Sequence, residues 1–272
     1  MSALSLAERL ELTVAIAREA GRMIVTAREQ QGFDHRYKLG DELVTDIDVQ
    51  VDTFIKQRLN AAFPDDAILS EELSPKQDGL AEAEALWVVD PIDGTVNFAH
   101  GLRHVAVSIA WAVKGHTQLG VVHAPFLDET FAGMLGQGAF CNQQPIRASQ
   151  ATELSRALVA TGFPHRRSER AALIQRLTAT LNHCQDVRRN GSAALDLCDV
   201  ACGRLDAYYE SVSPWDSAAG WLIAREAGAT VSHRYPCPED MPPDLYSKHL
   251  LVTAPGIHQA LEQLLREADD AA

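Results

Sequence analysis

The chain has 272 residues, of which 46% are hydrophobic and 22% are charged, and its formal net charge is −13. This length suits one large domain or two lobes that share a core, and the apolar fraction is typical of a globular protein. The negative charge argues against non-specific binding to nucleic acid, which needs a basic surface, but it allows an anionic substrate if bound cations invert the local field.

The N-terminal segment predicts an amphipathic helix over residues 6–30 rather than a targeting signal. Apolar Leu6, Leu10 and Val14 recur at helical spacing among charged residues. A signal peptide would have a basic start and an apolar block, and no apolar run in the chain reaches the length of a membrane span. The five cysteines are odd in number and form no Cys-x-x-Cys pair, which favours reduced thiols. We therefore expect a cytoplasmic protein.

The next part of the chain predicts a helix and a short strand that lead to an acidic pair. Apolar residues at helical spacing run through 44–63 and stop at Pro64. Residues 67–69 read as a strand, and Glu71 and Glu72 follow it. Taken alone, such a pair is more often solvated than bound to a ligand.

Residues 90–95, Asp-Pro-Ile-Asp-Gly-Thr, follow an apolar run at 86–89 that predicts a buried strand. We expect Pro91 to end this strand, because proline cannot continue a central strand and Asp-Gly is a turn signal. Asp90 and Asp93 then lie at the mouth of a strand, where open α/β sheets bind ligands. Carboxylates this close repel each other unless a cation joins them. Taken alone, the segment is equally compatible with a turn that carries two solvated acids.

Strands and helices alternate through the rest of the chain, which indicates an α/β or layered α+β architecture. Strands are predicted at 105–113, 118–123, 130–135, 158–161, 207–209 and 250–253, and helices at 170–181, 193–202, 217–227 and 255–269. Asp216 precedes the helix at 217 and, taken alone, would be its N-cap. A boundary near 148–155 divides the chain into lobes of approximately 1–150 and 151–272.

Two long motifs carry a resemblance to a known family. Residues 87–98, Trp-Val-Val-Asp-Pro-Ile-Asp-Gly-Thr-Val-Asn-Phe, and residues 215–228, which begin Trp-Asp-Ser-Ala-Ala-Gly and end Glu-Ala-Gly, resemble the signatures of the inositol monophosphatase family of metal-dependent sugar and polyol phosphatases. Smaller motifs match in the same order: Leu43-Val44-Thr45 with Asp48, Ser70-Glu71-Glu72, Gly191-Ser192-Ala193-Ala194, and residues 206–210. The resemblance covers nearly the whole chain and implies a single domain with a layered αβαβα sandwich.

The resemblance also implies a magnesium site and a set of catalytic residues. Two or three Mg²⁺ ions would be held by the residues matching Glu71, Asp90, Asp93 and Asp216, and by the backbone carbonyl matching Ile92. These are hard oxygen ligands, which suit Mg²⁺ rather than zinc. Glu71, Thr95 and Asp48 match catalytic residues of the family, of which the last two orient or deprotonate the attacking water.

The substrate contacts that the resemblance implies are Asp93, Gly94, Thr95, Gly191, Ser192, Ala193, Glu210 and Asp216. The backbone N–H groups near Gly94 and Thr95 would meet the phosphate, whereas Glu210 and the turn at Gly191 would bind the polyol hydroxyls. A rim carboxylate remains the alternative for Glu210. Arg188 and Arg189 could meet phosphate or a partner subunit, or form a solvated basic edge. Lys38 lies in a polar segment, 32–42, that could close over the metals, although its spacing varies within the family.

The predicted function is a Mg²⁺-dependent phosphomonoesterase that hydrolyses myo-inositol monophosphate by direct attack of water, without a phosphoenzyme. The resemblance further implies inhibition by lithium and a homodimer. One alternative is the same mechanism on histidinol phosphate, fructose 1,6-bisphosphate or 3′-phosphoadenosine 5′-phosphate. Another is a regulatory or binding protein on the same scaffold, because a fold does not determine a function. We expect a small phosphorylated polyol as partner, and neither direct nucleic-acid binding nor membrane association.

Overall fold

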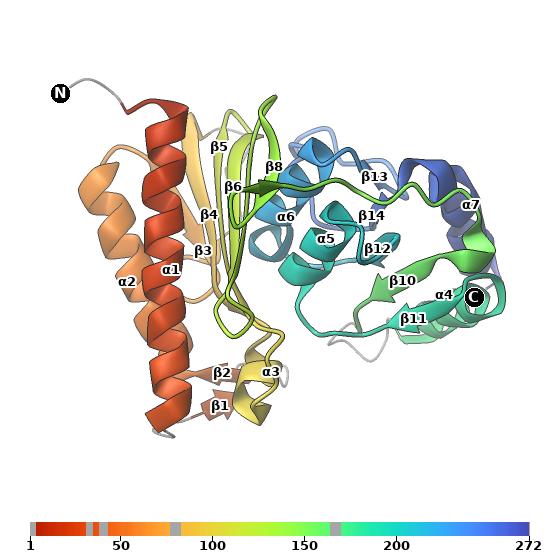
Figure 1. Ribbon diagram of the computed structural model, residues 1–272, viewed down its shortest axis with the longest axis horizontal. Coiled ribbons are helices and arrows are strands. Elements are labelled where there is room, and N and C mark those ends of the chain that lie inside the picture. The colour runs from red at the N-terminus through yellow and green to blue at the C-terminus, as the bar shows by residue number, and fades with distance from the viewer. Residues whose placement is uncertain (1–3, 31–34, 38–42, 77–82, 164–169, 272) are drawn as a thin grey trace.

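The chain folds into five alternating layers of helices and sheets, as the resemblance implied (Figure 1). The computed structural model describes residues 4–30, 35–37, 43–76, 83–163 and 170–271. Along the stack the layers are two helices, a seven-stranded sheet, two further helices, a five-stranded sheet and a last pair of helices. The three helical layers are α1 (Leu6–Gln30) with α2 (Asp46–Ala62), α5 (Ala193–Ala201) with α6 (Pro214–Glu226), and α4 (Arg170–His183) with α7 (His258–Asp270).

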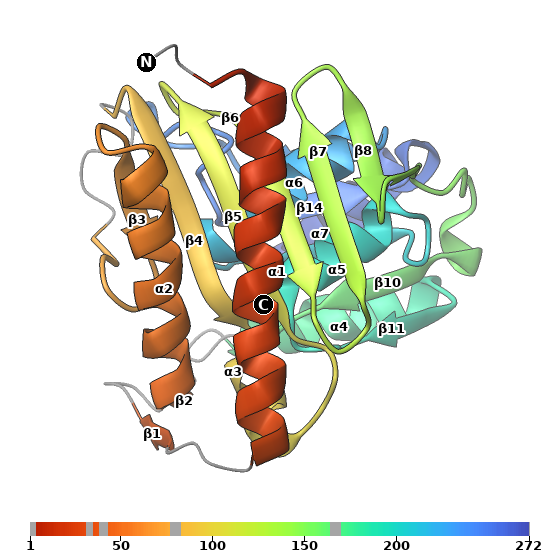
Figure 2. The same ribbon diagram turned by 60° about the vertical axis from the view of Figure 1, so that its left-hand side comes forward.

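The seven-stranded sheet is a meander whose first pair of strands is parallel and whose other pairs are antiparallel. In spatial order its strands are β3 (Ala67–Ser70), β4 (Ala85–Asp93), β5 (Ala106–Val113), β6 (His116–Ala124), β7 (Glu129–Met134), β8 (Gly138–Cys141) and β9 (Gln144–Pro145). Helices α1 and α2 lie side by side over one face of this sheet (Figure 2). Helix α6 packs on the opposite face, against β4, β5, β6 and β7.

The five-stranded sheet is mixed, with β10 parallel to both of its neighbours and the other pairs antiparallel. Its spatial order is β11 (Asp186–Arg188), β10 (Leu158–Thr161), β12 (Ala207–Glu210), β14 (Leu250–Thr253) and β13 (Thr230–His233). Within the described residues, the remaining elements are a two-stranded ribbon and three short helices: β1 (His35–Tyr37), β2 (Leu43–Thr45), α3 (Thr95–His100), η1 (Leu154–Arg156) and η3 (Pro255–Ile257).

Apolar side chains fill the space between every pair of adjacent layers. One cluster, which includes Ile16 and Trp87, lies between α1, α2 and the seven-stranded sheet. The largest cluster surrounds α5 and α6 and includes Leu197 and Trp221, so it joins both sheets. A third lies between the five-stranded sheet and α7. No helix in the described part of the chain is both long and apolar enough to span a membrane.

From the sequence we expected strand β4 to end at Pro91. In the structure it continues to Asp93. Strand β3 pairs with β4 only as far as Val89, and the pairing with β5 shifts register between Asp90 and Asp93. Pro91 therefore lies where neither neighbour needs its missing N–H, which is the position in a sheet that tolerates proline. The irregular pairing also re-aims the two aspartates at the end of the strand.

Helix α6 begins earlier than expected, at Pro214, so Asp216 is not its N-cap. Ser213 occupies that position with extended backbone angles, and Asp216 is the third helical residue. Proline at the first helical position is favourable because its missing N–H would have no partner there. Strands β8, β9, β11 and β13, each of two to four residues, were not predicted.

Candidate active site

A cavity of about 600 Å³ lies where the ends of β4 and β12 meet the N-termini of α3, α5 and α6. Residues from both halves of the chain form its walls. The sequence motifs predicted site residues that are equally far apart in the chain. The predicted site residues that line it are Glu71, Asp90, Ile92, Asp93, Gly94, Thr95, Gly191, Ser192, Ala193, Glu210 and Asp216.

Three of the predicted metal ligands form a tight cluster, since Asp90, Asp93 and Asp216 each offer an oxygen within 4.8 Å of the others. Burial raises the pKa of Asp90 well above its ordinary value, and the charges of Glu71, Asp93 and Asp216 raise it further. Burial, followed by the charge of Asp216, raises the pKa of Asp93 to about 7. Several carboxylates are thus crowded together at the same place, which is the environment a bound cation stabilises. The oxygen donors fit Mg²⁺.

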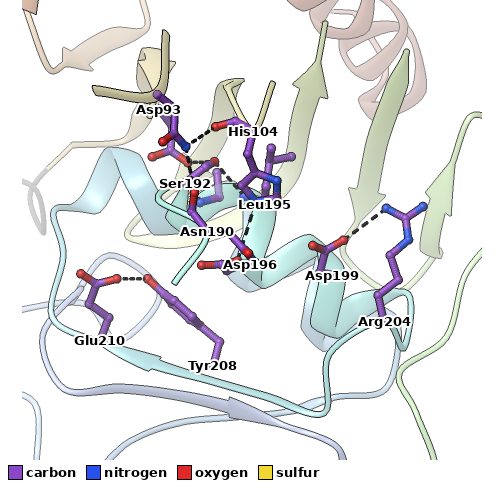
Figure 3. A network of polar contacts seen from close by, with 12 residues as sticks. Asp93, His104, Asn190, Ser192, Leu195, Asp196, Asp199, Arg204, Tyr208 and Glu210 are labelled. Atoms are coloured by element: carbon purple, nitrogen blue, oxygen red, sulfur yellow. Dashed lines mark hydrogen bonds and ion pairs between the residues drawn. The ribbon is translucent and has the colours of Figure 1, made fainter. Parts of the chain in front are cut away.

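Helix N-termini hold two of these carboxylates in place. Asp93 Oδ2 accepts hydrogen bonds from Ser192 Oγ at 2.5 Å and from the Ala194 backbone N–H at 2.7 Å, at the start of α5 (Figure 3). Asp216 Oδ2 accepts from the Ser213 backbone N–H at 2.7 Å, at the start of α6. The unpaired N–H groups and the positive end of a helix favour a carboxylate at this position.

Asp48 lies behind the cavity and is connected to it through Thr95. It is the third residue of α2 and belongs to a capping box, in which Asp48 Oδ2 accepts from the backbone N–H and the hydroxyl of Thr45, at 2.8 and 2.5 Å. Thr95 Oγ1 lies 2.9 Å from Asp48 Oδ1 and 3.1 Å from the Ile92 carbonyl, and donates toward these acceptors. Burial raises the pKa of the fully buried Asp48.

Two glycine turns meet at the centre of the site. Gly94, with φ +95°, ends β4 and caps α3, and Gly191, with φ +91°, precedes α5. A Cβ at Gly94 would lie 2.9 Å from the His104 carbonyl and 3.2 Å from the Gly191 carbonyl. Asn97 joins the same two loops, because its side-chain amide donates to the carbonyls of His104 and Asn190, at 2.7 and 2.8 Å. Glycine is therefore required at position 94 by both backbone angle and space.

A second cluster of ionisable side chains lies beside the Asn97 hydrogen bonds and consists of His104, Asp196 and Asp199. Asp196 Oδ1 accepts from the Asn190 amide at 2.7 Å and lies 3.7 Å from His104 Nε2, while Asp199 pairs with Arg204 (Figure 3). Burial opposes protonation of His104, but the nearby carboxylate of Asp196 and the charges of Asp199 and Asp93 outweigh it, so the pKa of His104 is raised. We interpret the group as an ion-pair network that supports the turn at Gly191.

The predicted basic residues have different positions. Arg189 lines the cavity, with its guanidinium 5.4 Å from the centroid of the Phe163 ring, whereas Arg188 is paired with Asp186 at 2.6 Å on the exposed strand β11. Lys38 and most of the segment 32–42 lie outside the described residues. Residues 35–37 of that segment form β1, which pairs with β2.

Sequence reasoning missed the residues that act through a neighbour. The sequence shows Asn97 as part of a motif, and it does not point to Asn190, Asp196 or Tyr208 as site residues. Strand alternation alone would have placed Tyr208 and Glu210 on one face of β12. The contact of Asn97 with Asn190 leaves no comparable signal, because no local pattern reports a hydrogen bond between residues 93 positions apart.

Comparisons with known proteins show the family and agree with the fold. The model of the inositol monophosphatase family matches residues 5–270. A Nus factor SuhB of Pasteurella multocida is 38% identical over 256 residues, which cover 91% of this chain and 92% of the relative. An inositol-1-monophosphatase of Synechocystis sp. is 41% identical over 237 residues, 86% and 80% of the two chains. The solved structure of an IMPase from Thermotoga maritima superimposes with a TM-score of 0.85 at 30% identity and covers 97% of this chain and 98% of its own.

Proposed function

The chain belongs to the inositol monophosphatase family, and we propose that it is a Mg²⁺-dependent phosphomonoesterase that hydrolyses myo-inositol monophosphate to inositol and phosphate. The observation that carries this proposal is the cluster of buried Asp90 and Asp93 with half-buried Asp216, and Glu71 beside it at the same cavity. The raised pKa values of Asp90 and Asp93 support a concentration of negative charge that a phosphate ester could approach only if cations were bound.

We assign Glu71, Asp90, Asp93, Asp216 and the Ile92 carbonyl as the ligands of two or three Mg²⁺ ions. Bound Mg²⁺ would lower the pKa of a water molecule and offset the charge of the attacking and leaving oxygens. Thr95 holds that water, since its hydroxyl can donate to Asp48 and still accept a hydrogen bond. Asp48 is the proton acceptor at the end of this chain, and its raised pKa makes it a stronger base than an exposed aspartate.

The remaining contacts recognise the substrate. The backbone N–H groups of Gly94 and Thr95 would meet the phosphate, and Asp93 and Asp216 would hold the cations that neutralise its charge. Glu210 and the turn at Gly191, Ser192 and Ala193 face the polyol across the same cavity. A carboxylate and backbone groups suit a ligand with several hydroxyls, which is why we favour inositol monophosphate over esters with fewer hydroxyls.

A phosphate-release assay tests this function. The purified protein should hydrolyse inositol 1-phosphate with Mg²⁺, lose activity with EDTA, and rank inositol phosphate above histidinol phosphate, fructose 1,6-bisphosphate and 3′-phosphoadenosine 5′-phosphate in kcat/KM. Asp93→Asn should lower kcat by at least about 10²-fold, the scale of one lost electrostatic contact in a transition state. Asp65→Asn, at an exposed position, is the matched control. If inositol phosphate ranked last, the substrate assignment would be wrong.

A regulatory role beside catalysis is the second candidate, because relatives such as that of Pasteurella multocida carry the name Nus factor SuhB. A metal-ligand variant that lost hydrolysis but retained the cellular phenotype would support it.

We further propose that the protein is a cytoplasmic homodimer and that lithium inhibits it. The five free cysteines are consistent with a reducing compartment. Size-exclusion chromatography with light scattering tests the dimer, and the phosphate-release assay with lithium tests the inhibition.

A further inference from the structure

Glu210 is held from behind by the hydroxyl of a buried tyrosine. Tyr208 and Glu210 are two residues apart on β12, so they lie on the same face of the sheet. Tyr208 is fully buried, and its hydroxyl donates a hydrogen bond to Glu210 Oε2 at 2.5 Å (Figure 3). Glu210 lines the cavity, and Tyr208 lies beneath it in the central core cluster.

Gly162, which follows β10, contacts the Glu210 carboxylate from the other side. A Cβ built on Gly162 would overlap both carboxylate oxygens of Glu210, so the backbone there lies directly against the carboxylate. The Glu210 side chain is thus confined between the Gly162 backbone and the Tyr208 hydroxyl. A long acidic side chain at the rim of a cavity normally loses rotamer entropy when it binds a ligand, and this confinement removes much of that cost in advance.

The surroundings of Glu210 disfavour its ionised form, so a hydrogen-bond donor is needed to stabilise the carboxylate. Burial, and then the charge of Asp216, raise the pKa of Glu210 to about 8, whereas the hydrogen bond from Tyr208 and the charge of Arg189 lower it. Tyr208 therefore favours the ionised form of a carboxylate that its surroundings oppose. A phenol hydrogen bond to a charged acceptor is stronger than one between neutral groups.

We propose that Tyr208 is a positioning residue that fixes Glu210 for the hydroxyl groups of the substrate, and that together with Gly162 it gives the enzyme its preference for polyol phosphates. This inference rests on the proposed function, in which Glu210 binds the polyol. Tyr208 does not touch the substrate. Its effect should therefore appear in the binding of hydroxylated substrates and not in the chemistry at phosphorus.

Tyr208→Phe tests the proposal, because it removes the hydroxyl and keeps the ring that fills the core. For inositol 1-phosphate we expect KM to rise about tenfold, which corresponds to ~1.4 kcal/mol, with kcat nearly unchanged. For p-nitrophenyl phosphate, which has no polyol hydroxyls, both constants should stay as in the parent enzyme. Tyr209→Phe is the matched control: its hydroxyl lies 3.2 Å from Thr180 Oγ1 on the opposite face of β12, and its loss should leave the ratio of the two substrates unchanged.

A second measurement does not depend on the substrate. ¹³C NMR of the Glu210 carboxyl, assigned with Glu210→Gln, should show a higher pKa in Tyr208→Phe than in the parent protein, with and without Mg²⁺, and no change in Tyr209→Phe. An unchanged pKa, or an equal loss of kcat/KM on both substrates, would overturn the positioning role. If the parent enzyme did not hydrolyse inositol phosphate, the proposed function would fail by itself. The best hydroxylated phosphate of the panel would then replace it in the same comparison.

Discussion

At the scale of the residue, two acidic side chains of the candidate site are also parts of helix caps. Asp48 in α2 and Asp216 in α6 are each the third helical residue, and each accepts a hydrogen bond from the backbone N–H of its N-cap residue. An N-cap residue is worth about 0.5–2 kcal/mol of stability, and in a capping box the third helical residue supports the same helix end. Replacement of either aspartate by alanine would therefore mix loss of stability with loss of activity. Asparagine keeps an oxygen acceptor and is the more informative replacement.

Thr95 offers a cleaner test of the water-positioning step, because its hydroxyl makes its contacts within the site. We predict that Thr95→Ala lowers kcat by about 10²–10⁴-fold, the usual contribution of positioned proton transfer, with little change in the temperature of unfolding. Thr95→Ser keeps the hydroxyl that bonds to Asp48 and should retain most activity. Steady-state kinetics and thermal unfolding of both variants provide the measurement. Equal kcat values for the alanine and serine variants would contradict the role given to the hydroxyl.

Residues of the site differ in how far the sequence could identify them. Asp90, Asp93 and Thr95 lie in one short motif with an unusual composition, so the resemblance named them directly. Asn97 lies in the same motif, yet its partners at 104 and 190 are set by how two distant loops meet. Long-range packing of this kind depends on the whole fold, and no single sequence displays it.

At the scale of the element, the position of α6 depends on a close contact with the sheet. Gly120 of β6 faces this helix, and a Cβ there would lie 2.7 Å from the Ala219 carbonyl oxygen and 2.9 Å from Ala219 Cα. Both of these atoms belong to the backbone, which cannot move aside as a side chain can. Because α6 carries Asp216 in its first turn, the glycine also bears on the geometry of the site.

We predict that Gly120→Ala destabilises the protein by about 1–3 kcal/mol, the usual cost of overpacking a core, and lowers kcat because α6 must shift. Its cross-strand partner Gly133 is the matched control, since a Cβ there would meet Ile223 of the same helix at 3.4 Å. Gly133→Ala should cost much less. Urea unfolding and phosphate release compare the two variants. A larger loss of stability for Gly133→Ala would show that the contact with Ala219 does not limit the packing.

Elements with strong periodicity were predicted well, and those whose limits depend on partners were not. The predictions for α1, β10 and β14 agree with the observed bounds, because each is a clear apolar pattern. Strand β4 continues beyond Pro91 because its pairing with β3 ends at Val89 and its pairing with β5 shifts register after Asp90. Strand β9 has only two residues and exists because β8 is beside it. Local patterns cannot contain information of this kind.

At the scale of the whole molecule, the cavity lies between residues from the two halves of the chain. The seven-stranded sheet comes from residues 67–145 and the five-stranded sheet from residues 158–253. We propose that lobes of approximately 1–150 and 151–272 form a single domain, because α6 from the second half packs on the first sheet. The hydrogen bonds from Asn97 to Asn190 and from Ser192 to Asp93 cross between the lobes.

This crossing predicts that Asn97 couples the lobes. Asn97→Ala should leave both of its backbone acceptors without this donor, and we expect a loss of about 1–3 kcal/mol, as for other buried unsatisfied groups. Hydrogen exchange should become faster in the loops around residues 94–104 and 190–194 together. Asn142→Ala, which removes an amide that donates to the Asp128 carbonyl and accepts from the Thr130 N–H, serves as the control and should affect neither of those loops. Faster exchange in only one of the two loops would contradict the coupling.

The buried carboxylates also predict how pH and magnesium together determine the stability of the whole protein. In the folded state the pKa of Asp93 is about 7, against an ordinary value of 3.8, so between these values the folded state binds more protons than the unfolded state. Stability should therefore fall as pH rises from about 4 to about 7. Mg²⁺ at about 100 times its dissociation constant adds roughly 2.7 kcal/mol, and protons compete with it at the acid end, so its effect should be larger at pH 8 than at pH 5.

Thermal unfolding across this pH range, with Mg²⁺ and with EDTA, measures both effects. Without metal the unfolding temperature should decrease toward pH 7, and Mg²⁺ should reverse most of that decrease. His104, whose pKa is also raised, contributes a loss of stability of the same sign as pH rises. The comparison with Asp93→Asn removes the carboxylate together with the part of the His104 shift that its charge causes, so this variant should show a weaker dependence on both pH and Mg²⁺. A metal-free curve with the same slope in both proteins would exclude Asp93 as a source of the dependence.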